Sequence, residues 1–218
     1  MHISVSNLLK IKKEIELKQL NKENQTEIIA VSKKFNLKQI IPLIEIGHTN
    51  FGENKVQEAV EKWSNIKKQN NKIKLHMIGK LQTNKVKYVI PLFDYIHSLD
   101  NLKLAEKISS EQRKINKELK IFIQVNVGDE IQKSGIKVDD VKDFYLKCIN
   151  DFKLNIVGLM CIPPITNNVE LYFGKMLELK KLIGLKELSM GMSADYLEAI
   201  KFGSSFVRIG SKIFGPRA

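Results

Sequence analysis

The stretch Thr26–Lys34, TEIIAVSKK, places a lysine directly after a short apolar run. Residues 28–31 are all apolar, which is typical of a parallel strand that is buried on both faces. Lys33 would then follow the carboxyl end of that strand, where ligands collect in α/β folds because the loops there form the crevice. An amine at such a place can attack a carbonyl carbon to form an imine. The alternative is a solvated lysine that begins a loop.

The composition favours one domain spanning residues 1–218, with a sizeable core. The net charge of +12 comes from 36 basic and 24 acidic residues, a balance compatible with nucleic acid or an anionic membrane surface as partner. However, the lysines are scattered through amphipathic segments, no nucleic-acid-binding motif occurs, and the only arginines are Arg113, Arg208 and Arg217. No apolar run approaches the length of a membrane span. We therefore interpret the charge as a solvated surface and expect neither a nucleic-acid nor a membrane partner.

Cysteine and histidine usage limits the redox and metal chemistry. Cys148 and Cys161 are not preceded by a recognisable signal peptide, which favours buried thiols in a cytoplasmic protein over a disulfide framework. None of the four histidines has the spacing of metal ligands; they are His2, His48, His76 and His97. We expect no metal site.

Helical and strand patterns alternate along the chain. An amphipathic helix is expected over residues 4–20, with Ser4 or Ser6 as its cap. Strands are expected at 28–31, 51–54, 74–79, 95–99, 121–127, 155–160, 188–190 and 206–209, and helices at 37–46, 56–63, 84–89, 101–116, 138–149, 169–183 and 194–202. This α/β alternation predicts a single (β/α)8 TIM barrel with an extra N-terminal helix. An open, doubly wound sheet is the alternative.

In such a barrel, the residues just after each strand meet at one end. They are Lys33, Asn54, Gly79, Asn126, Met160, Met192 with Ser193, and residues 208–211. One amine, several amides and hydroxyls, and an arginine suit an anionic ligand that carries a carbonyl group.

The loops after the seventh and eighth strands contain the sharpest signal. Residues 191–195, GMSAD, enter a helix whose first N–H groups can meet an anion, and Ser193 can donate a hydroxyl or act as an ordinary N-cap. Gly210-Ser211 repeats the pattern, either as an anion site or as a plain turn. TIM barrels commonly bind phosphate in these two loops.

Arg208 lies within the apolar run 206–209, FVRI, where an unpaired guanidinium would be costly to bury. We therefore expect it to have a partner. That partner is either an acidic residue on a neighbouring strand or an acceptor, such as a ring nitrogen, on a ligand in the barrel mouth.

The sequence also resembles the pyridoxal phosphate homeostasis proteins over nearly its whole length. The matching motifs are AVSK at 30–33, FGENKVQE at 51–58, HMIGKLQTNK at 76–85, KSGI at 133–136, GLMCIPP at 158–164, LSMGMSADYLEAIKFGS at 188–204 and VRIGSKIFGPR at 207–217. So many matches at matching spacing are not expected by chance.

The resemblance implies an alanine racemase-like barrel that holds pyridoxal 5′-phosphate (PLP) as an imine on Lys33. It implies further cofactor-binding roles for Asn54 near the ring, Arg208 at the pyridine nitrogen, and Met192, Ser193, Gly210 and Ser211, the last three of which hold the phosphate. Ser211 stands where many relatives have threonine, and either residue supplies a hydroxyl. Lys133 matches a lysine that relatives carry near the mouth, where it would help to receive or release cofactor; the alternative is a surface lysine.

Two functions fit the resemblance: a PLP carrier in vitamin B6 and amino-acid homeostasis, or a small PLP-dependent racemase. Racemases that resemble this barrel have a further β domain whose tyrosine supplies a second base, whereas this chain ends at Ala218, soon after the eighth strand. An arginine at the ring nitrogen also weakens the ring as an electron sink. We therefore expect a monomeric, cytoplasmic carrier with little or no turnover, and apo PLP-dependent enzymes as recipients.

Overall fold

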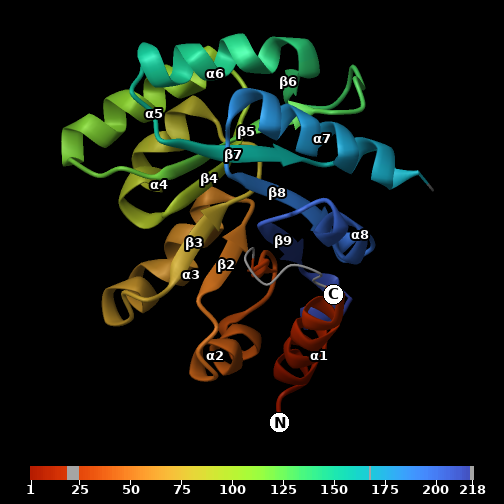
Figure 1. Cartoon of the computed structure of the whole chain (residues 1–218). Helices are drawn as coiled ribbons and strands as arrows, with labels where there is room; N and C mark the ends of the chain where they lie inside the picture. The colour runs from red at the N-terminus through yellow and green to blue at the C-terminus, as the bar shows by residue number, and fades with distance from the viewer. Residues whose placement is uncertain (19–24, 167, 217–218) are drawn as a thin grey trace.

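The computed structural model describes residues 1–18, 25–166 and 168–216. The strands are β1 (Glu27–Val31), β2 (Asn50–Glu53), β3 (Lys74–Met77), β4 (Tyr95–Leu99), β5 (Lys120–Asn126), β6 (Ile136–Lys137), β7 (Ile156–Cys161), β8 (Glu187–Met192) and β9 (Phe206–Ile209). They pair in parallel, and the ring closes because β4 pairs with β5 and β9 pairs with β1. The two-residue β6 adds to β5 outside this ring. The predicted eight-stranded barrel is confirmed (Figure 1).

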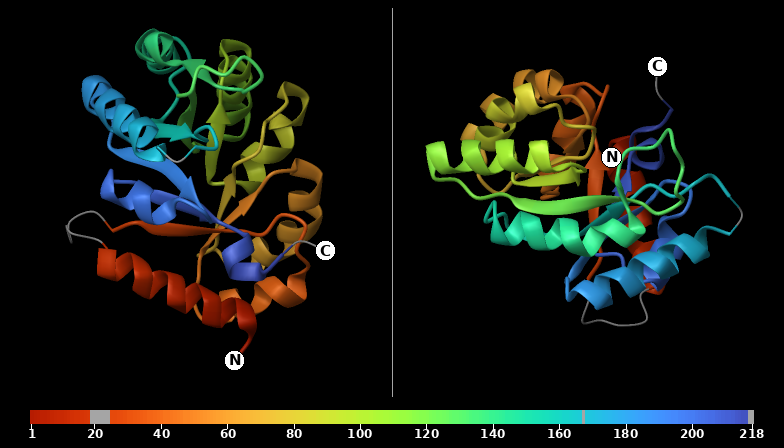
Figure 2. Two further views of the ribbon diagram at one scale, coloured as in Figure 1. Left: turned by 90° about the vertical axis from the view of Figure 1, so that its right-hand side faces the viewer. Right: turned by 90° about the horizontal axis from the view of Figure 1, so that it is seen from above.

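Helices surround the strands on the outside (Figure 2). They are α1 (Ile3–Lys18), α2 (Leu37–Glu45), α3 (Val56–Gln69), α4 (Val86–Leu92), α5 (Leu102–Ile115), α6 (Val141–Asn150), α7 (Val169–Ile183), α8 (Tyr196–Lys201) and α9 (Ser211–Phe214), with 3-10 turns η1 (Thr83–Lys85) and η2 (Val138–Asp140) before α4 and α6. The extra helix α1 packs against α9, α2 and α8, so the two described ends of the chain lie side by side.

The barrel has two apolar regions, which explains why β1 is apolar at successive positions. Ile28 and Ala30 pack outward into the core between strands and helices. Ile29 points inward and joins a smaller interior cluster of Tyr95, Phe122, Met160 and Phe206. Because both faces of β1 are buried, the residues that point inward and those that point outward must both be apolar.

Several local predictions were wrong. Helix α1 begins at Ile3, so Ser4 and Ser6 lie within it and neither caps it; the expected end at Leu20 lies outside the described residues. Strand β7 continues to Cys161, which places Met160 in the barrel interior instead of at the mouth. The elements β6 and α9 span only two and four residues, too short for a periodic pattern to predict.

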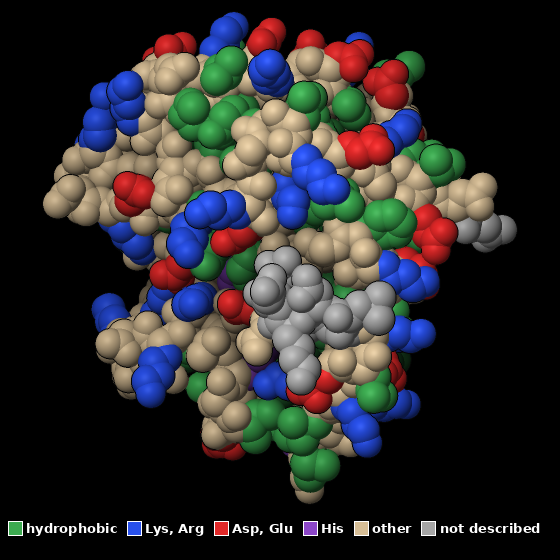
Figure 3. Space-filling view, in the orientation of Figure 1, with side chains coloured by type: hydrophobic (Ala, Val, Ile, Leu, Met, Phe, Trp, Pro, Cys, Tyr) green, Lys and Arg blue, Asp and Glu red, His purple; other side chains and the backbone are tan. Residues whose placement is uncertain are grey.

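Basic and acidic side chains are interspersed on the face shown in Figure 3, and the basic ones do not gather there into one patch. This distribution agrees with the interpretation of the net charge as a solvated surface. Among the helices of the described ranges, none combines the length and the apolar character that a bilayer crossing needs.

Candidate functional site

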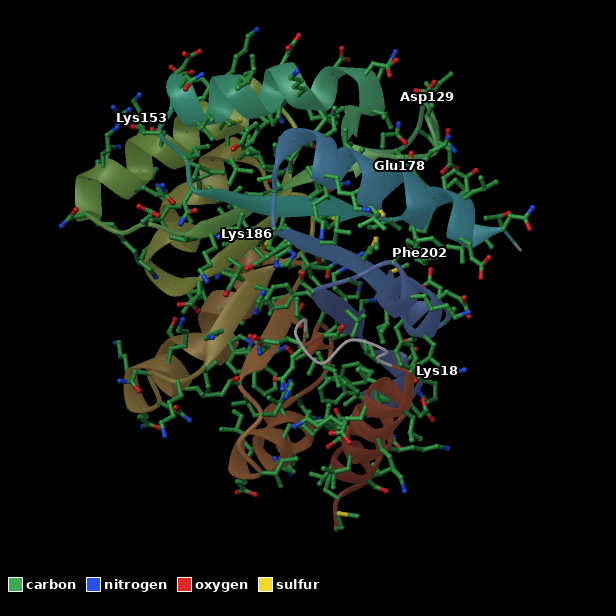
Figure 4. All side chains as sticks on the ribbon, viewed as in Figure 1. Lys18, Asp129, Lys153, Glu178, Lys186 and Phe202 are labelled. Atoms are coloured by element: carbon green, nitrogen blue, oxygen red, sulfur yellow. The ribbon has the colours of Figure 1, made fainter. Side chains whose placement is uncertain are left out.

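The candidate site residues lie at the ends of four adjacent strands, β8, β9, β1 and β2. Met192 pairs with Arg208, Ala30 with Ile209, and Val31 with Gly52, so these strands end at a common rim. In Figure 4, Lys153 and Lys186, which precede β7 and β8, lie to the left of Asp129, which follows β5. The carboxyl ends of these strands therefore point toward the right-hand side of that view.

Lys33 lies in a tight turn that β2 and α3 hold in place. The Ser32 N–H donates to the Gly52 carbonyl at 3.0 Å, and the Phe35 N–H closes the turn on the Ser32 carbonyl at 3.1 Å. Lys34 adopts a left-handed φ of 65°, and its N–H donates to Glu58 Oε1 at 2.5 Å. The backbone on both sides of Lys33 is therefore fixed, which limits where its amine can reach.

A buried carboxylate anchors the same turn from behind. Glu53 Oε1 accepts the Ser32 hydroxyl at 2.7 Å, the Trp63 indole N–H at 2.9 Å and the Lys62 amine at 2.9 Å. Lys62 also binds Glu58 and the Ser32 carbonyl. Lys62 is therefore committed to a structural ion pair, although it lies close to Lys33.

Asn54 follows β2 with a polar atom that lacks a partner. Its side-chain Oδ1 is buried, and within the described ranges it accepts no hydrogen bond. Gly79 packs against its backbone: a Cβ added at Gly79 would lie 2.3 Å from the Asn54 carbonyl oxygen and 2.7 Å from its Cα. The loop after β3 therefore requires glycine at this point, and Asn54 keeps an acceptor oxygen that suits a ligand donor.

Arg208 is buried in the barrel and is held by oxygen atoms of its neighbours. Nη1 donates to the Ser189 carbonyl at 2.6 Å and to the Ser189 hydroxyl at 2.9 Å, and Nη2 donates to the Cys161 carbonyl at 2.8 Å. The expected partner of Arg208 is therefore present as neutral acceptors, and the acidic partner considered as one alternative is not found among the described residues. In that part of the chain, the Nε–H and the second Nη2 hydrogen have no protein acceptor.

The guanidinium of Arg208 is a buried positive charge at the base of the rim. Burial lowers the pKa of the guanidinium from its ordinary value, while Cys161 and Asp195 act in the opposite direction. Arginine nevertheless stays protonated in proteins. Burial also raises the pKa of the Cys161 thiol to about 12, so Cys161 is a neutral thiol. The site therefore presents a desolvated positive charge with free donors, which suits an electron-rich acceptor.

The loop after β8 differs from its predicted form. β8 has an extra residue relative to β9 between Ser189 and Met192, at Gly191, whose φ is 91°. The Met192 N–H donates to Asp195 Oδ1 at 2.6 Å, and Asp195 precedes α8, so Ser193 is not the N-cap. Among the described contacts the Ser193 hydroxyl has no hydrogen-bond partner, and Met192 is partly exposed beside it.

The loop after β9 brings Gly210 against β1. A Cβ added to Gly210 would lie 3.4 Å from both the carbonyl oxygen and the Cβ of Val31, which is ordinary van der Waals contact, so Gly210 lies directly against the end of β1. Ser211 then begins α9 and is exposed. Its side-chain hydroxyl forms no hydrogen bond among the described residues, so it is accessible to a ligand.

Lys133 belongs to the adjoining part of the rim, on the loop between β5 and β6. Its amine forms an ion pair with Glu130 and donates to the Pro163 carbonyl, after β7, at 3.2 Å. Lys133 therefore ties two mouth loops together, a structural role that sequence reasoning did not predict.

The interior residues that support Arg208 were also missed. Ser189 and Cys161 lie within predicted strands, but only the closed ring shows that they face the same arginine. One sequence signal could have identified Ser189. Side chains alternate between the two faces of a strand, and Ser189 pairs with Phe206, so both point into the barrel.

Comparisons with known proteins identify the family to which this chain belongs. The family model described as the alanine racemase N-terminal domain matches residues 7–218. The pyridoxal phosphate homeostasis protein of Haemophilus influenzae is 40% identical over 223 residues, which cover 97% of this chain and 94% of the relative. This chain belongs to the pyridoxal phosphate homeostasis protein family. The resemblance stated from its motifs is confirmed.

Solved structures of this homeostasis protein family share the fold. The structure of PipY from Synechococcus elongatus without PLP has a TM-score of 0.86 at 29% identity, covering 98% of this chain and all of PipY. The structure of PipY with PLP bound has a TM-score of 0.83 at 28% identity, covering 97% of this chain and all of PipY.

Proposed function

We propose that this protein binds PLP at the rim formed by β8, β9, β1 and β2, as a carrier in PLP homeostasis. Arg208 carries the argument: a buried guanidinium with two free donors among the described residues and no acidic partner needs an acceptor. The pyridine nitrogen of PLP is such an acceptor. The names of the homeostasis proteins and the PLP-bound relative support the same ligand.

The residues present fit the other groups of PLP. The orphaned Oδ1 of Asn54 can accept from a ligand donor beside the ring. The hydroxyls of Ser193 and Ser211 can donate to a phosphate, and Gly210 leaves room for it beside Val31. Met192 borders the same loop. When bound, PLP supplies an aldehyde that reacts reversibly with amines.

Lys33 is the residue that joins the cofactor. Its amine would be the nucleophile that holds the aldehyde which PLP carries. The hydrogen-bonded turn around Ser32 and Lys34 fixes the backbone from which this side chain extends. Lys62 is excluded from the reaction because Glu53 and Glu58 hold its amine.

Borohydride reduction tests this assignment. We expect the purified protein to be yellow and reduction to fix the cofactor to Lys33, because only a C=N bond gives both the colour and a reducible link. Peptide mapping locates the label, and Lys34→Ala and Lys133→Ala serve as matched controls that keep it. A label on another lysine, or none, would show that the site is wrong.

We propose further that the carrier does not turn over amino acids. Arg208 donates and does not protonate the ring nitrogen, which leaves the ring a weak electron sink. Racemisation needs a second base besides Lys33. The thiol of Cys161 is protonated and buried, and the amine of Lys133 is held by Glu130 and the Pro163 carbonyl, so neither group is placed to act as that base. A free amino acid that replaces Lys33 at the aldehyde would release one cofactor per protein molecule. We propose that the carrier acts as a monomer in the cytoplasm and that an apo PLP-dependent enzyme receives the cofactor.

The alternative, a racemase, is favoured by the racemase-like domain. The assay follows α-proton exchange in deuterated water for alanine and serine, with Lys33→Ala as control. We expect no multiple-turnover exchange near the typical enzyme rate of about 1 s⁻¹ or more. Rapid exchange that disappears in Lys33→Ala would identify a compact enzyme instead.

A further inference from the structure

A continuous chain of hydrogen-bonded side chains crosses the barrel interior from its amino end to Arg208. Its members, called the polar chain below, are Glu27, Asn50, His76, His97, Ser189 and Arg208. The five links measure 2.5, 3.0, 3.0, 2.9 and 2.9 Å in that order. The two histidines show no metal-ligand spacing in the sequence, and the function proposed above does not use them.

The cation end sets the direction of the first links. Arg208 can only donate, so Ser189 Oγ accepts from it. Among the described contacts His97 Nδ1 is the one acceptor within reach of the Ser189 O–H, so we assign this hydrogen to His97. His97 Nδ1 is then an acceptor, and its Nε2 carries the proton that goes to His76 Nδ1.

The anion end independently sets the same direction. A carboxylate only accepts, so Asn50 donates its Nδ2–H to Glu27 Oε2 and turns Oδ1 toward His76 Nε2, which must carry a proton. The reverse arrangement would put Asn50 Oδ1 against a carboxylate at one end. At the other end, Ser189 Oγ would accept from both Arg208 and His97, and its O–H would have no acceptor among the described contacts. Both ends therefore favour the Nε2–H tautomer in His76 and His97.

The surroundings keep both rings neutral and fixed. His76 stacks on Tyr95 with centroids 4.3 Å apart, and His97 stacks on Phe122 at 4.3 Å. Both imidazoles are fully buried, and burial lowers the pKa of each well below the ordinary value. Two charged rings would also put N–H against N–H across the 3.0 Å link between them.

We propose that the polar chain positions Arg208 for its ligand by joining the buried guanidinium, through oriented hydrogen bonds, to an acceptor oxygen of Glu27. Every link points its donor away from Arg208 and toward Glu27, so the bond dipoles add along the chain and strengthen one another. Glu27 is exposed and, with Asn50, lines a cavity of about 350 Å³ at the amino end, opposite the rim. Asn50, His76, His97 and Ser189 are positioning residues, and the part of this proposal that concerns ligand binding rests on the function proposed above.

Histidine side-chain NMR of the protein without added PLP tests the chain itself. In ¹⁵N-labelled protein, with signals assigned through His2→Gln and His48→Gln, we expect His76 and His97 each to show a protonated Nε2 and a bare Nδ1. Glu27→Leu removes one of the two ends that favour the Nε2–H tautomer, so His76 should show a measurable share of the Nδ1–H tautomer while the Arg208 end still favours Nε2–H. Glu27→Gln keeps an acceptor oxygen and should restore the single tautomer. A different wild-type tautomer, or no change in Glu27→Leu, would overturn the proposal.

Titration with PLP measures the coupling to Arg208. We expect Glu27→Leu to weaken binding about 2- to 12-fold, the range that the net contribution of one hydrogen bond corresponds to, and Glu27→Gln to recover most of it. Glu187→Gln is the matched control, since Glu187 begins β8 and has no hydrogen bond to the polar chain among the described contacts. Equal weakening by Glu187→Gln and Glu27→Leu would show a through-space field and overturn the role of the chain.

The two measurements separate the two proposals. If the wild-type protein does not bind PLP, the proposed function fails and the ligand-positioning role of Arg208 fails with it. The NMR result still decides whether Glu27 sets the tautomers.

Discussion

Two sets of polar groups in this molecule, the polar chain and the rim residues, differ in their hydrogen bonding. Along the polar chain, each link from Glu27 to Arg208 has a defined donor and acceptor. At the rim, the Asn54 Oδ1 is buried without a partner, and within the described ranges the hydroxyls of Ser193 and Ser211 have none either.

This difference separates groups that hold the protein together from groups that await a ligand. A buried polar atom without a hydrogen bond costs about 1–3 kcal/mol, so proteins keep few of them unless a function requires them. Arg208 belongs to both regions, because three of its donor contacts face the interior and its other hydrogens have no described acceptor. It is the point at which the fold meets the proposed site.

The largest expected effect that tests this comparison is a loss of folding stability in acid. Burial lowers the pKa of His48 to about 4, with Lys12 acting in the same direction, and burial lowers the pKa of His76 and His97 well below 6.5. Between pH 6.5 and 4 the unfolded chain therefore binds protons that the folded protein excludes. Stability is full above pH 6.5 and falls as the pH decreases, by up to about 1.4 kcal/mol per pH unit for His48, and the lowered pKa values of His76 and His97 add to the loss in the same direction.

Urea unfolding at several pH values measures this slope. His48→Gln should remove about 3 kcal/mol of the loss between pH 6.5 and 4 and leave the part that His76 and His97 contribute. A free energy of unfolding that stays constant over this window would contradict the assignment of neutral, buried imidazoles.

A pair of substitutions compares the two regions directly. His97→Leu leaves the Ser189 hydroxyl and His76 Nδ1 unpaired, so we expect a loss of about 2–6 kcal/mol in the free energy of unfolding. Asn54→Ala removes an acceptor that is already unpaired, so stability should change by less than about 1 kcal/mol while PLP binding weakens. Equal losses of stability in both variants would erase the distinction between the regions.

The smallest expected effect concerns the two rim hydroxyls. Each should form a charge-assisted bond to phosphate worth about 1.5–3 kcal/mol, so Ser193→Ala with Ser211→Ala should weaken PLP retention more than either change alone. Gel filtration followed by absorption of the bound cofactor compares the variants. Equal binding of pyridoxal and its phosphate ester to the wild-type protein would argue against a phosphate site.

The sequence predicts the barrel well because its signal is local. Each apolar run, such as that ending at Val31, reports its own burial, and the regular alternation with amphipathic helices leaves few topologies open. The residues after the strands can be named by the same logic, which brings Lys33 and Asn54 to one rim. The matching motifs then assign the chain to the pyridoxal phosphate homeostasis protein family, and the comparisons confirm this assignment.

What the sequence does not predict depends on distance across the closed ring. His97 lies in β4 and Ser189 in β8, 92 positions apart, and no local pattern indicates that they share a hydrogen bond. The carbonyl groups that bind Arg208 also cannot be predicted from the sequence. Every residue has a carbonyl group, and only the register of neighbouring strands decides which ones face Arg208. Ser193 does not take the N-cap position, one of the two roles considered for it, because α8 begins after Asp195, and the extra residue in β8 that precedes this loop is equally invisible to a local pattern.

The aromatic filling of the barrel also decides how any cargo travels. Tyr95, Phe122 and Phe206 pack with Ile29 and Met160 between the amino-end cavity and the rim, so the interior is a plug and not a passage. A molecule that enters at the rim must leave by the same doorway. If the protein is the carrier proposed above, loading and delivery would use the same opening and could not take place at the same time.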